Sequence, residues 1–121
     1  MSKKILIVDD EKDLVELIAL RMQAEGFDTL MAFDGDEALK KAKKHLPDMV
    51  LLDIMMHGVN GYQVARELKK NEATKNIKII MVTAKVGERE RFWGMESGAD
   101  EYVTKPFEMP VLITLVKKLL G

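Results

Sequence analysis

Cysteine is absent from this sequence, and its absence removes several kinds of site. A chain without cysteine has no disulfide framework, no cysteine-ligated zinc site and no cysteine nucleophile. Proline and glycine are sparse, at 3 and 8 of 121 residues, which excludes a collagen-like or low-complexity chain. An excess of one charge is also missing, since 19 Lys and Arg stand against 20 Asp and Glu, for a formal net charge of −1. The overall charge therefore favours neither nucleic acid nor a membrane as a direct partner.

Long hydrophobic runs are missing as well. No apolar run exceeds four residues, whereas a membrane-spanning helix needs about 20. The basic start, residues 1–4, is followed by four apolar residues before Asp9, and a signal peptide needs an apolar segment of about 7 to 15. We therefore expect a cytoplasmic protein. Apolar residues make up 47% of a chain whose length is typical of one domain, so we predict a single domain over residues 1–121.

Short apolar runs alternate along the chain with amphipathic stretches. The apolar runs predict buried strands over 5–8, 29–33, 49–52, 77–82 and 101–104. The stretches between them predict helices over 13–25, 36–44, 62–70, 88–97 and 110–120. This alternation is typical of an α/β fold in which helices cover both faces of a parallel sheet. In the first helix, Leu14, Leu17, Ile18 and the pair Arg21-Met22 recur at helical spacing, which predicts that this side is buried.

Polar residues with distinct chemistry follow several of the predicted strands. Asp9 and Asp10 follow the first strand, Asp53 the third, Thr83 the fourth and Lys105 the fifth. The carboxyl ends of parallel strands lie at one edge of the sheet, where ligands bind in such folds. Carboxylates crowded together there repel one another unless a cation is bound or their pKa values rise. An all-oxygen ligand set favours Mg²⁺.

These residues together suit the handling of a phosphoryl group. A metal ion and an ammonium group neutralise phosphoryl oxygens, a hydroxyl donates a hydrogen bond to them, and a carboxylate can itself be the nucleophile. Each residue also has an ordinary interpretation. Asp9 and Asp10 could cap the first helix, Thr83 could be a plain strand residue, and Lys105 could be a surface lysine. Their joint occurrence at strand ends favours the phosphoryl site.

The sequence resembles the receiver domain of two-component response regulators, the CheY-like family. The resemblance covers essentially the whole chain and rests on four segments, in order, at the expected strand ends. These segments are 5–11, 51–56, 81–84 and 98–107. The resemblance implies a flavodoxin-like (βα)5 fold, with a five-stranded parallel sheet in the order 2-1-3-4-5.

The resemblance also implies roles for the acidic residues. Asp53 would accept a phosphoryl group from a phosphohistidine. Asp10 would hold Mg²⁺ directly and Asp9 mainly through water, and Asp53 would join them as a metal ligand. Met55, two residues after the phosphoacceptor, would give its backbone carbonyl to the metal.

Three further residues take roles from the same resemblance. Thr83 would move to hydrogen-bond the phosphoryl group, and Lys105 would pair with that group. Tyr102 would be the switch aromatic, which turns inward when Thr83 moves. The family usually has a cis peptide bond at the position of Lys105-Pro106.

The function implied is a phosphorylation-dependent signalling switch. A sensor histidine kinase or a phosphotransfer protein would supply the phosphoryl group. Phosphorylation would shift the face formed by the predicted helix 88–97, strand 101–104 and helix 110–120 toward an active arrangement. Hydrolysis of the aspartyl phosphate would reset it. The chain would thus catalyse its own phosphoryl uptake and dephosphorylation. It would not be an enzyme that turns over an external metabolite.

One position departs from the family pattern. After residues 53–56 the family commonly has Pro and then Gly, and this chain has His57 and then Gly58. Loss of the proline loosens the loop beside the phosphorylation site. His57 is either an exposed loop histidine, which we favour, or a group that senses pH or contacts a partner.

The predicted helices 88–97 and 110–120 carry apolar residues that do not all lie on one buried side. Phe92 and Trp93 are adjacent, so both cannot face the core, and we expect Trp93 toward the surface. Ile113 and Leu120 are expected off the buried stripe of the last helix, which is made of Leu112, Leu115, Val116 and Leu119. Trp93, Ile113 and Leu120 could therefore form a partner or homodimer surface, or be ordinary surface apolar residues.

Alternatives to the switch remain. A non-phosphorylated interaction module of the same fold would take up no phosphate. A flavin-binding protein of this sheet order needs a phosphate loop after the first strand, where residues 9–13 are strongly acidic. An aspartyl phosphatase places its nucleophile after the first strand in an Asp-x-Asp pattern, which Asp9-Asp10 does not match. The effector is not encoded by an obvious motif, so the receiver could act alone or belong to a larger regulator.

Overall fold

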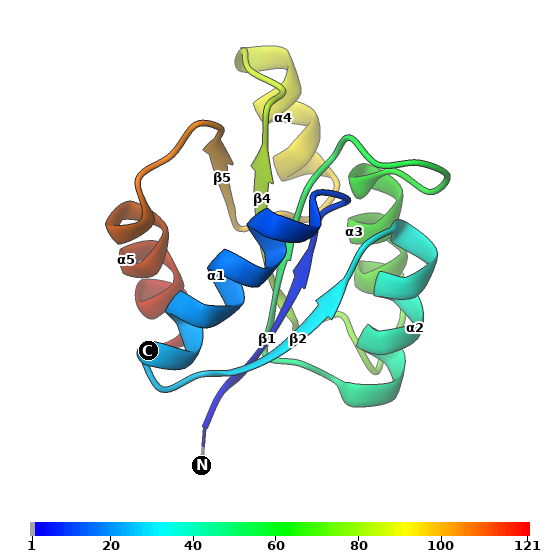
Figure 1. The fold of residues 1–121 in the computed structure, drawn as a ribbon. Helices are drawn as coiled ribbons and strands as arrows, with labels where there is room; N and C mark the ends of the chain where they lie inside the picture. The colour runs from blue at the N-terminus through cyan, green and yellow to red at the C-terminus, as the bar shows by residue number, and fades with distance from the viewer. Residues whose placement is uncertain (1) are drawn as a thin grey trace.

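A computed structural model describes residues 2–121 and contains one parallel sheet of five strands in the order β2-β1-β3-β4-β5 (Figure 1). The strands are β1 (Lys4–Val8), β2 (Asp28–Ala32), β3 (Met49–Leu52), β4 (Lys78–Thr83) and β5 (Glu101–Thr104). The predicted α/β class and the strand order are confirmed. Two predicted strands have the observed bounds, and the other three differ by one residue at one or both ends.

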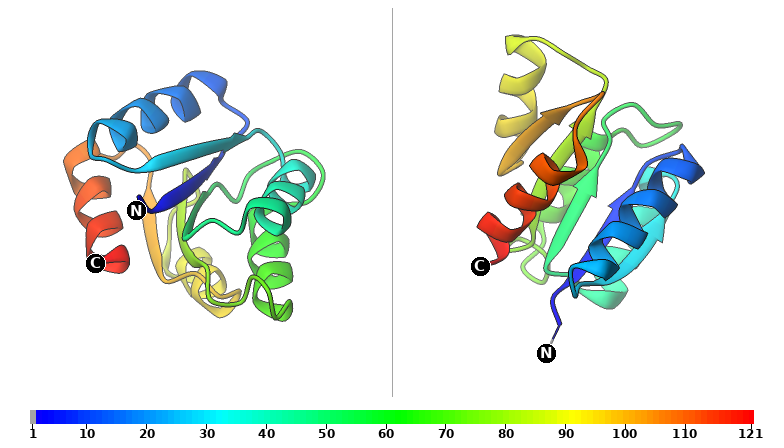
Figure 2. Two further views of the ribbon diagram at one scale, coloured as in Figure 1. Left: turned by 90° about the horizontal axis from the view of Figure 1, so that it is seen from below. Right: turned by 60° about the vertical axis from the view of Figure 1, so that its left-hand side comes forward.

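A helix follows each strand. The helices are α1 (Lys12–Ala24), α2 (Gly35–His45), α3 (Gly61–Lys70), α4 (Glu88–Glu96) and α5 (Met109–Leu120). Viewed along the strands, α1 and α5 lie on one face of the sheet and α2, α3 and α4 on the other (Figure 2). Both faces of the sheet are therefore covered, which explains why the strands are continuously apolar. No helix of residues 2–121 is long and apolar enough to cross a membrane.

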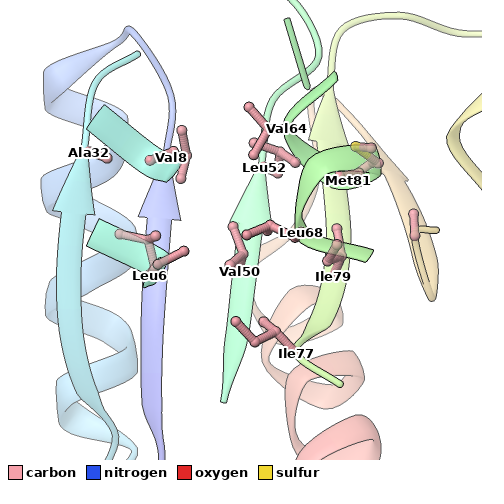
Figure 3. Close-up of a cluster of buried hydrophobic side chains, with 14 of the residues drawn as sticks. Leu6, Val8, Ala32, Val50, Leu52, Val64, Leu68, Ile77, Ile79 and Met81 are labelled. Carbon is pink, nitrogen blue, oxygen red and sulfur yellow. The ribbon is translucent and has the colours of Figure 1, made fainter. Parts of the chain in front are cut away.

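Each face of the sheet has its own apolar core. On the side of α2 and α3, side chains from β1, β3 and β4 meet Val64 and Leu68 of α3 (Figure 3). On the other side, alternate residues of the same strands pack against α1 and α5. Because side chains alternate along a strand, a single apolar run supplies both cores.

Two predicted helix faces are corrected by the structure. In α1 the buried residues are Val15, Ile18, Ala19 and Met22, and Leu17 is 51% exposed. In α5, Ile113 is 8% exposed and belongs to the core with Leu112 and Val116, so its predicted position off the buried stripe is wrong. Residues of both helices belong to one buried cluster on the same face of the sheet, so this shared core decides which side of each helix is buried.

The loop between β3 and α3 is fixed tightly at the start of the helix. The Asn60 side chain accepts a hydrogen bond from Gln63 N–H at 3.0 Å, and the Gln63 side chain accepts from Asn60 N–H at 2.9 Å. This reciprocal pair is a capping box. Gly61 follows, and a Cβ there would collide with the carbonyl oxygen of Asp53. The absence of a side chain at Gly61 therefore lets α3 begin directly against the end of β3.

Candidate functional site

The carboxyl ends of β1, β3, β4 and β5 lie at one edge of the sheet (Figure 1), and the predicted site residues follow these ends in the sequence. Val8 of β1 pairs with Leu52 of β3, so Asp9 and Asp53 follow partnered residues. The Asp53 N–H donates to the Val8 carbonyl at 3.1 Å and continues the ladder by one step. The sheet register itself therefore sets these two carboxylates side by side.

Three carboxylates form a compact cluster at this edge. Asp9, Asp10 and Asp53 each have a carboxylate oxygen within 4.8 Å of the others. Asp9 and Asp53 are both 4% exposed, whereas Asp10 is exposed. The cluster is thus open to solvent on one side and enclosed on the other.

Lys105 reaches back from the end of β5 into the carboxylate cluster. Its ammonium nitrogen lies 2.6 Å from Asp9 Oδ2 and 3.4 Å from Asp53 Oδ2. A third acid, Glu11 on the rim, lies 3.3 Å from the same nitrogen. The peptide bond between Lys105 and Pro106 is cis, as the resemblance implied. One cation therefore stands among carboxylates from two strand ends and a loop.

Burial and ion pairing have opposite effects on the pKa values of Asp9 and Lys105. Burial raises the pKa of the Asp9 carboxyl, although the Lys105 ammonium and the Glu11 N–H, which donates to Asp9 Oδ1 at 2.9 Å, both lower it. For Lys105, burial lowers the pKa, but the hydrogen bond to Asp9 and the charges of Asp53 and Asp9 outweigh burial and leave the pKa raised. The ammonium therefore stays charged at neutral pH and offsets part of the repulsion among the carboxylates.

Asp53 is held by the backbone that follows it. Its Oδ1 accepts a hydrogen bond from the Met55 N–H at 3.2 Å. The Met55 side chain is 54% exposed. Met55 thus contacts Asp53 through its backbone N–H, and the role of its backbone carbonyl as a metal ligand stays a prediction.

Thr83 and Tyr102 are joined by the residue between them in space, Lys85. The Lys85 N–H donates to Thr83 Oγ1 at 3.3 Å. The Lys85 carbonyl accepts a hydrogen bond from the Tyr102 hydroxyl at 2.8 Å. Thr83 is fully buried, and Tyr102 is 5% exposed, with its ring inside the protein. The two predicted switch residues are therefore linked through the backbone of one residue, whose N–H contacts Thr83 and whose carbonyl contacts Tyr102.

A pocket of about 450 Å³ opens beside the carboxylates. It is lined by Asp10, Ile54, Met55, Met56, His57, Asn60, Tyr62 and Lys85. The sequence analysis did not place Tyr62 or Lys85 here, and it missed the contact of Glu11 with Lys105. Lys85 could have been found from its position two residues after Thr83, because a short loop keeps it near the strand end. His57 is exposed on this rim, which fits both of the interpretations that the sequence analysis gave it.

The three residues predicted for a partner face do not form one surface. Trp93 is 54% exposed on α4 and packs edge to face against Phe92, with ring centroids 5.5 Å apart. Ile113 is buried in the core of α5, and Leu120 is half-buried at its end. Of the three, Trp93 alone offers an exposed aromatic surface.

The donor set fits a hard divalent cation. Asp9, Asp10 and Asp53 supply carboxylate oxygens, and no cysteine or histidine belongs to the cluster within residues 2–121. Oxygen ligands, with water completing the shell, are what Mg²⁺ prefers. The exposure of Asp10 leaves a path from solvent for such an ion and its water ligands.

Comparisons with known proteins agree with the fold. The family model for the response regulator receiver domain matches residues 5–117. A putative response regulator from Chloroflexus aurantiacus is 33% identical, with 99% of this chain and 98% of that chain covered and a TM-score of 0.93. A response regulator receiver domain from Francisella is also 33% identical, covering 98% and 96% of the two chains with a TM-score of 0.91. The non-phosphorylated HemR receiver domain from Leptospira biflexa is 28% identical, covering 99% and 95% with a TM-score of 0.91.

The fold and the acidic edge thus define a two-component signalling module. This chain belongs to the receiver domain family of response regulators. Members of the family are signalling switches, and they interact with histidine kinases or phosphotransfer proteins.

Proposed function

We propose that this protein is a phosphorylation-dependent switch in which Asp53 accepts the phosphoryl group. The observation that carries the proposal is the position of Asp53, a buried carboxylate that lies beside Asp9 and Asp10 and 3.4 Å from the Lys105 ammonium. The donor would be a phosphohistidine on a sensor kinase or phosphotransfer protein.

In the proposed reaction a carboxylate oxygen of Asp53 attacks phosphorus. The new P–O bond forms as the P–N bond to the donor imidazole breaks, and that imidazole takes up a proton. Asp9, Asp10, Asp53 and the Met55 carbonyl would hold Mg²⁺, which supplies charge neutralisation at the phosphoryl oxygens. Lys105 pairs with one of those oxygens, and the Thr83 hydroxyl donates a hydrogen bond to another.

The output in this proposal is a shift in population between two arrangements of α4, β5 and α5. The phosphoryl group favours one arrangement only through contacts that differ between the two. The movement of Thr83 toward the phosphoryl group alters its hydrogen bond with Lys85, and Lys85 contacts Tyr102 of β5. Partners, homodimer formation through this face and a cytoplasmic location remain predictions, which pull-down, sedimentation and cell fractionation would check.

Intact-mass spectrometry after incubation with acetyl phosphate tests the proposed function. The wild type should gain a single phosphoryl adduct in the presence of Mg²⁺ and none in its absence. Asp53→Ala should gain no adduct while keeping the circular dichroism spectrum of the fold. An adduct that persists in Asp53→Ala would refute the assignment of Asp53. Absence of any adduct in the wild type would favour the non-phosphorylated interaction module.

A further inference from the structure

Gly94 lies in the middle of α4 and has no obvious local reason to be glycine. Its backbone is helical, so no left-handed conformation requires it. A glycine inside a helix destabilises that helix relative to alanine, because more backbone freedom is lost on folding. Within α4, Gly94 is also the only buried residue. The reason for glycine here must therefore lie in what packs against it.

The ring of Tyr102 occupies the space where a side chain at position 94 would lie. A Cβ on Gly94 would be 2.9 Å from Cδ2 and 3.0 Å from Cε2 of Tyr102. Carbon atoms in ordinary contact are about 3.5 to 4.0 Å apart. The aromatic ring and the backbone of α4 are thus closer than any residue with a Cβ would allow without movement.

The Tyr102 ring is also held from other sides, so it cannot move aside freely. Its hydroxyl donates to the Lys85 carbonyl at 2.8 Å. The Arg91 guanidinium lies 5.9 Å from the ring centroid and donates to the Tyr102 carbonyl at 3.3 Å. The Tyr62 hydroxyl of α3 donates a hydrogen bond to the Glu90 carbonyl of α4 at 3.2 Å, which fixes α4 beside the ring. Expelling the ring would break the hydrogen bond to Lys85, which in turn contacts Thr83.

We propose that Gly94 is a positioning residue: its missing side chain admits the Tyr102 ring against α4 and so couples α4 to Thr83. The transmitting part of this role rests on the proposed function, whereas the packing part does not. A methyl group at position 94 displaces the ring and breaks the link through Lys85. It leaves Asp9, Asp10, Asp53 and Lys105 in place, because none of them contacts α4 in the hydrogen bonds and ion pairs of residues 2–121.

Tyrosine nitration tests the packing without any phosphodonor. The variants are Gly94→Ala and a matched control, Met95→Ala, which changes an exposed residue of the same helix. After treatment with tetranitromethane, peptide mass spectrometry should find Tyr102 protected in the wild type and in Met95→Ala. It should find Tyr102 nitrated in Gly94→Ala. Equal protection of Tyr102 in Gly94→Ala and the wild type would overturn the proposal.

The effect of Gly94→Ala on the free energy of unfolding provides a second test, because it should change sign when the Tyr102 ring is removed. Alanine at position 94 should destabilise the protein when Tyr102 is present, because the ring is displaced. It should stabilise the protein in the Tyr102→Ala background, where only helix propensity remains. Urea unfolding of the four proteins in this cycle measures both effects. The same sign in both backgrounds would show that Gly94 does not act through the ring.

The transmitting role is tested with Trp93, the only tryptophan and the neighbour of Gly94. On incubation with acetyl phosphate and Mg²⁺, the wild type and Met95→Ala should show a change in Trp93 fluorescence. Gly94→Ala should gain the phosphoryl adduct by mass and lose the fluorescence change. A normal fluorescence change in Gly94→Ala would overturn the transmitting role. No adduct in the wild type would refute the proposed function and this role together, while nitration still decides the packing.

Discussion

At Lys105 a single ammonium group faces the carboxylates of Asp9, Asp53 and Glu11. Asp9 and Asp53 are buried, so their charges are poorly screened by water, and Lys105 compensates them. A phosphoryl group on Asp53 would add further negative charge beside the same ammonium. Lys105 therefore connects the electrostatics of the site with the end of β5.

Lys105→Ala should destabilise the protein and uncouple its switch. Without Mg²⁺ we expect a loss of about 1–3 kcal/mol in the free energy of unfolding, because buried carboxylates lose their partner. Mg²⁺ binding should persist, since Lys105 is not a metal ligand. Phosphorylation should no longer alter the fluorescence of Trp93. Urea unfolding, Mg²⁺ titration and fluorescence measure these three effects.

A matched control for this variant is Lys117→Ala. Lys117 pairs with Glu25 on the surface, where solvent screens the pair and leaves it little effect on stability. Lys117→Ala should therefore keep both the stability and the fluorescence response. Normal switching in Lys105→Ala would contradict the role given to Lys105.

Tyr102 should titrate at unusually high pH. Burial, together with the nearby Tyr62 and Glu90, raises the pKa of the Tyr102 hydroxyl from 10.0 to about 12. Because the folded-state pKa is the higher one, Tyr102 contributes stability that is fully present below pH 10 and is lost as the pH rises through about 12. The ultraviolet absorbance of tyrosinate and urea unfolding against pH measure this, with Tyr102→Phe as control. An ordinary tyrosinate transition near pH 10 for Tyr102 would contradict its enclosed environment.

The sequence predicted the residues at this edge because position after a strand is a backbone property. Asp9 and Asp53 follow apolar runs, and parallel strands bring such positions together whatever the side chains do. The contacts of Glu11 and Lys85 depend on side-chain direction and loop path, which no periodicity encodes. The close packing of Gly94 against Tyr102 was missed for the same reason.

At the scale of helices and strands, alternation predicted all five strand–helix pairs and the strand order followed from the family resemblance. The errors concern which side of a helix is buried. Leu17 was expected on the buried side of α1 and is exposed. Ile113 was expected off the buried stripe of α5 and is buried. Helical spacing gives the angle between residues but leaves open which direction faces the sheet.

The capping box at the start of α3 should matter for stability. Asn60→Ala removes the acceptor for the Gln63 N–H, so we expect a loss of about 1 kcal/mol in the free energy of unfolding. Urea unfolding measures it, and Asn76→Ala, in the exposed loop before β4, is the control. Equal stability of Asn60→Ala and the wild type would show that the cap is replaced by water.

For the whole molecule, Mg²⁺ should act as a stabilising ligand. An ion that binds the folded carboxylate cluster and not the unfolded chain raises the free energy of unfolding by about 2.7 kcal/mol at one hundred times its Kd. Urea unfolding at increasing Mg²⁺ concentration measures this increase. Asp53→Ala should weaken it, whereas Asp28→Ala, an exposed acid at the opposite end of the sheet, should not. Equal stabilisation in both variants would place the ion elsewhere.

The central claim is that Asp53 is the residue that carries the phosphoryl group. The most direct measurement is to phosphorylate the protein with acetyl phosphate and Mg²⁺, reduce the aspartyl phosphate with borohydride and sequence the peptides by mass spectrometry. Reduction of an acyl phosphate converts that aspartate to homoserine. Homoserine at residue 53, dependent on both Mg²⁺ and phosphodonor, is the predicted result. Homoserine at Asp9 or Asp10, or unmodified aspartate at every position, would contradict it.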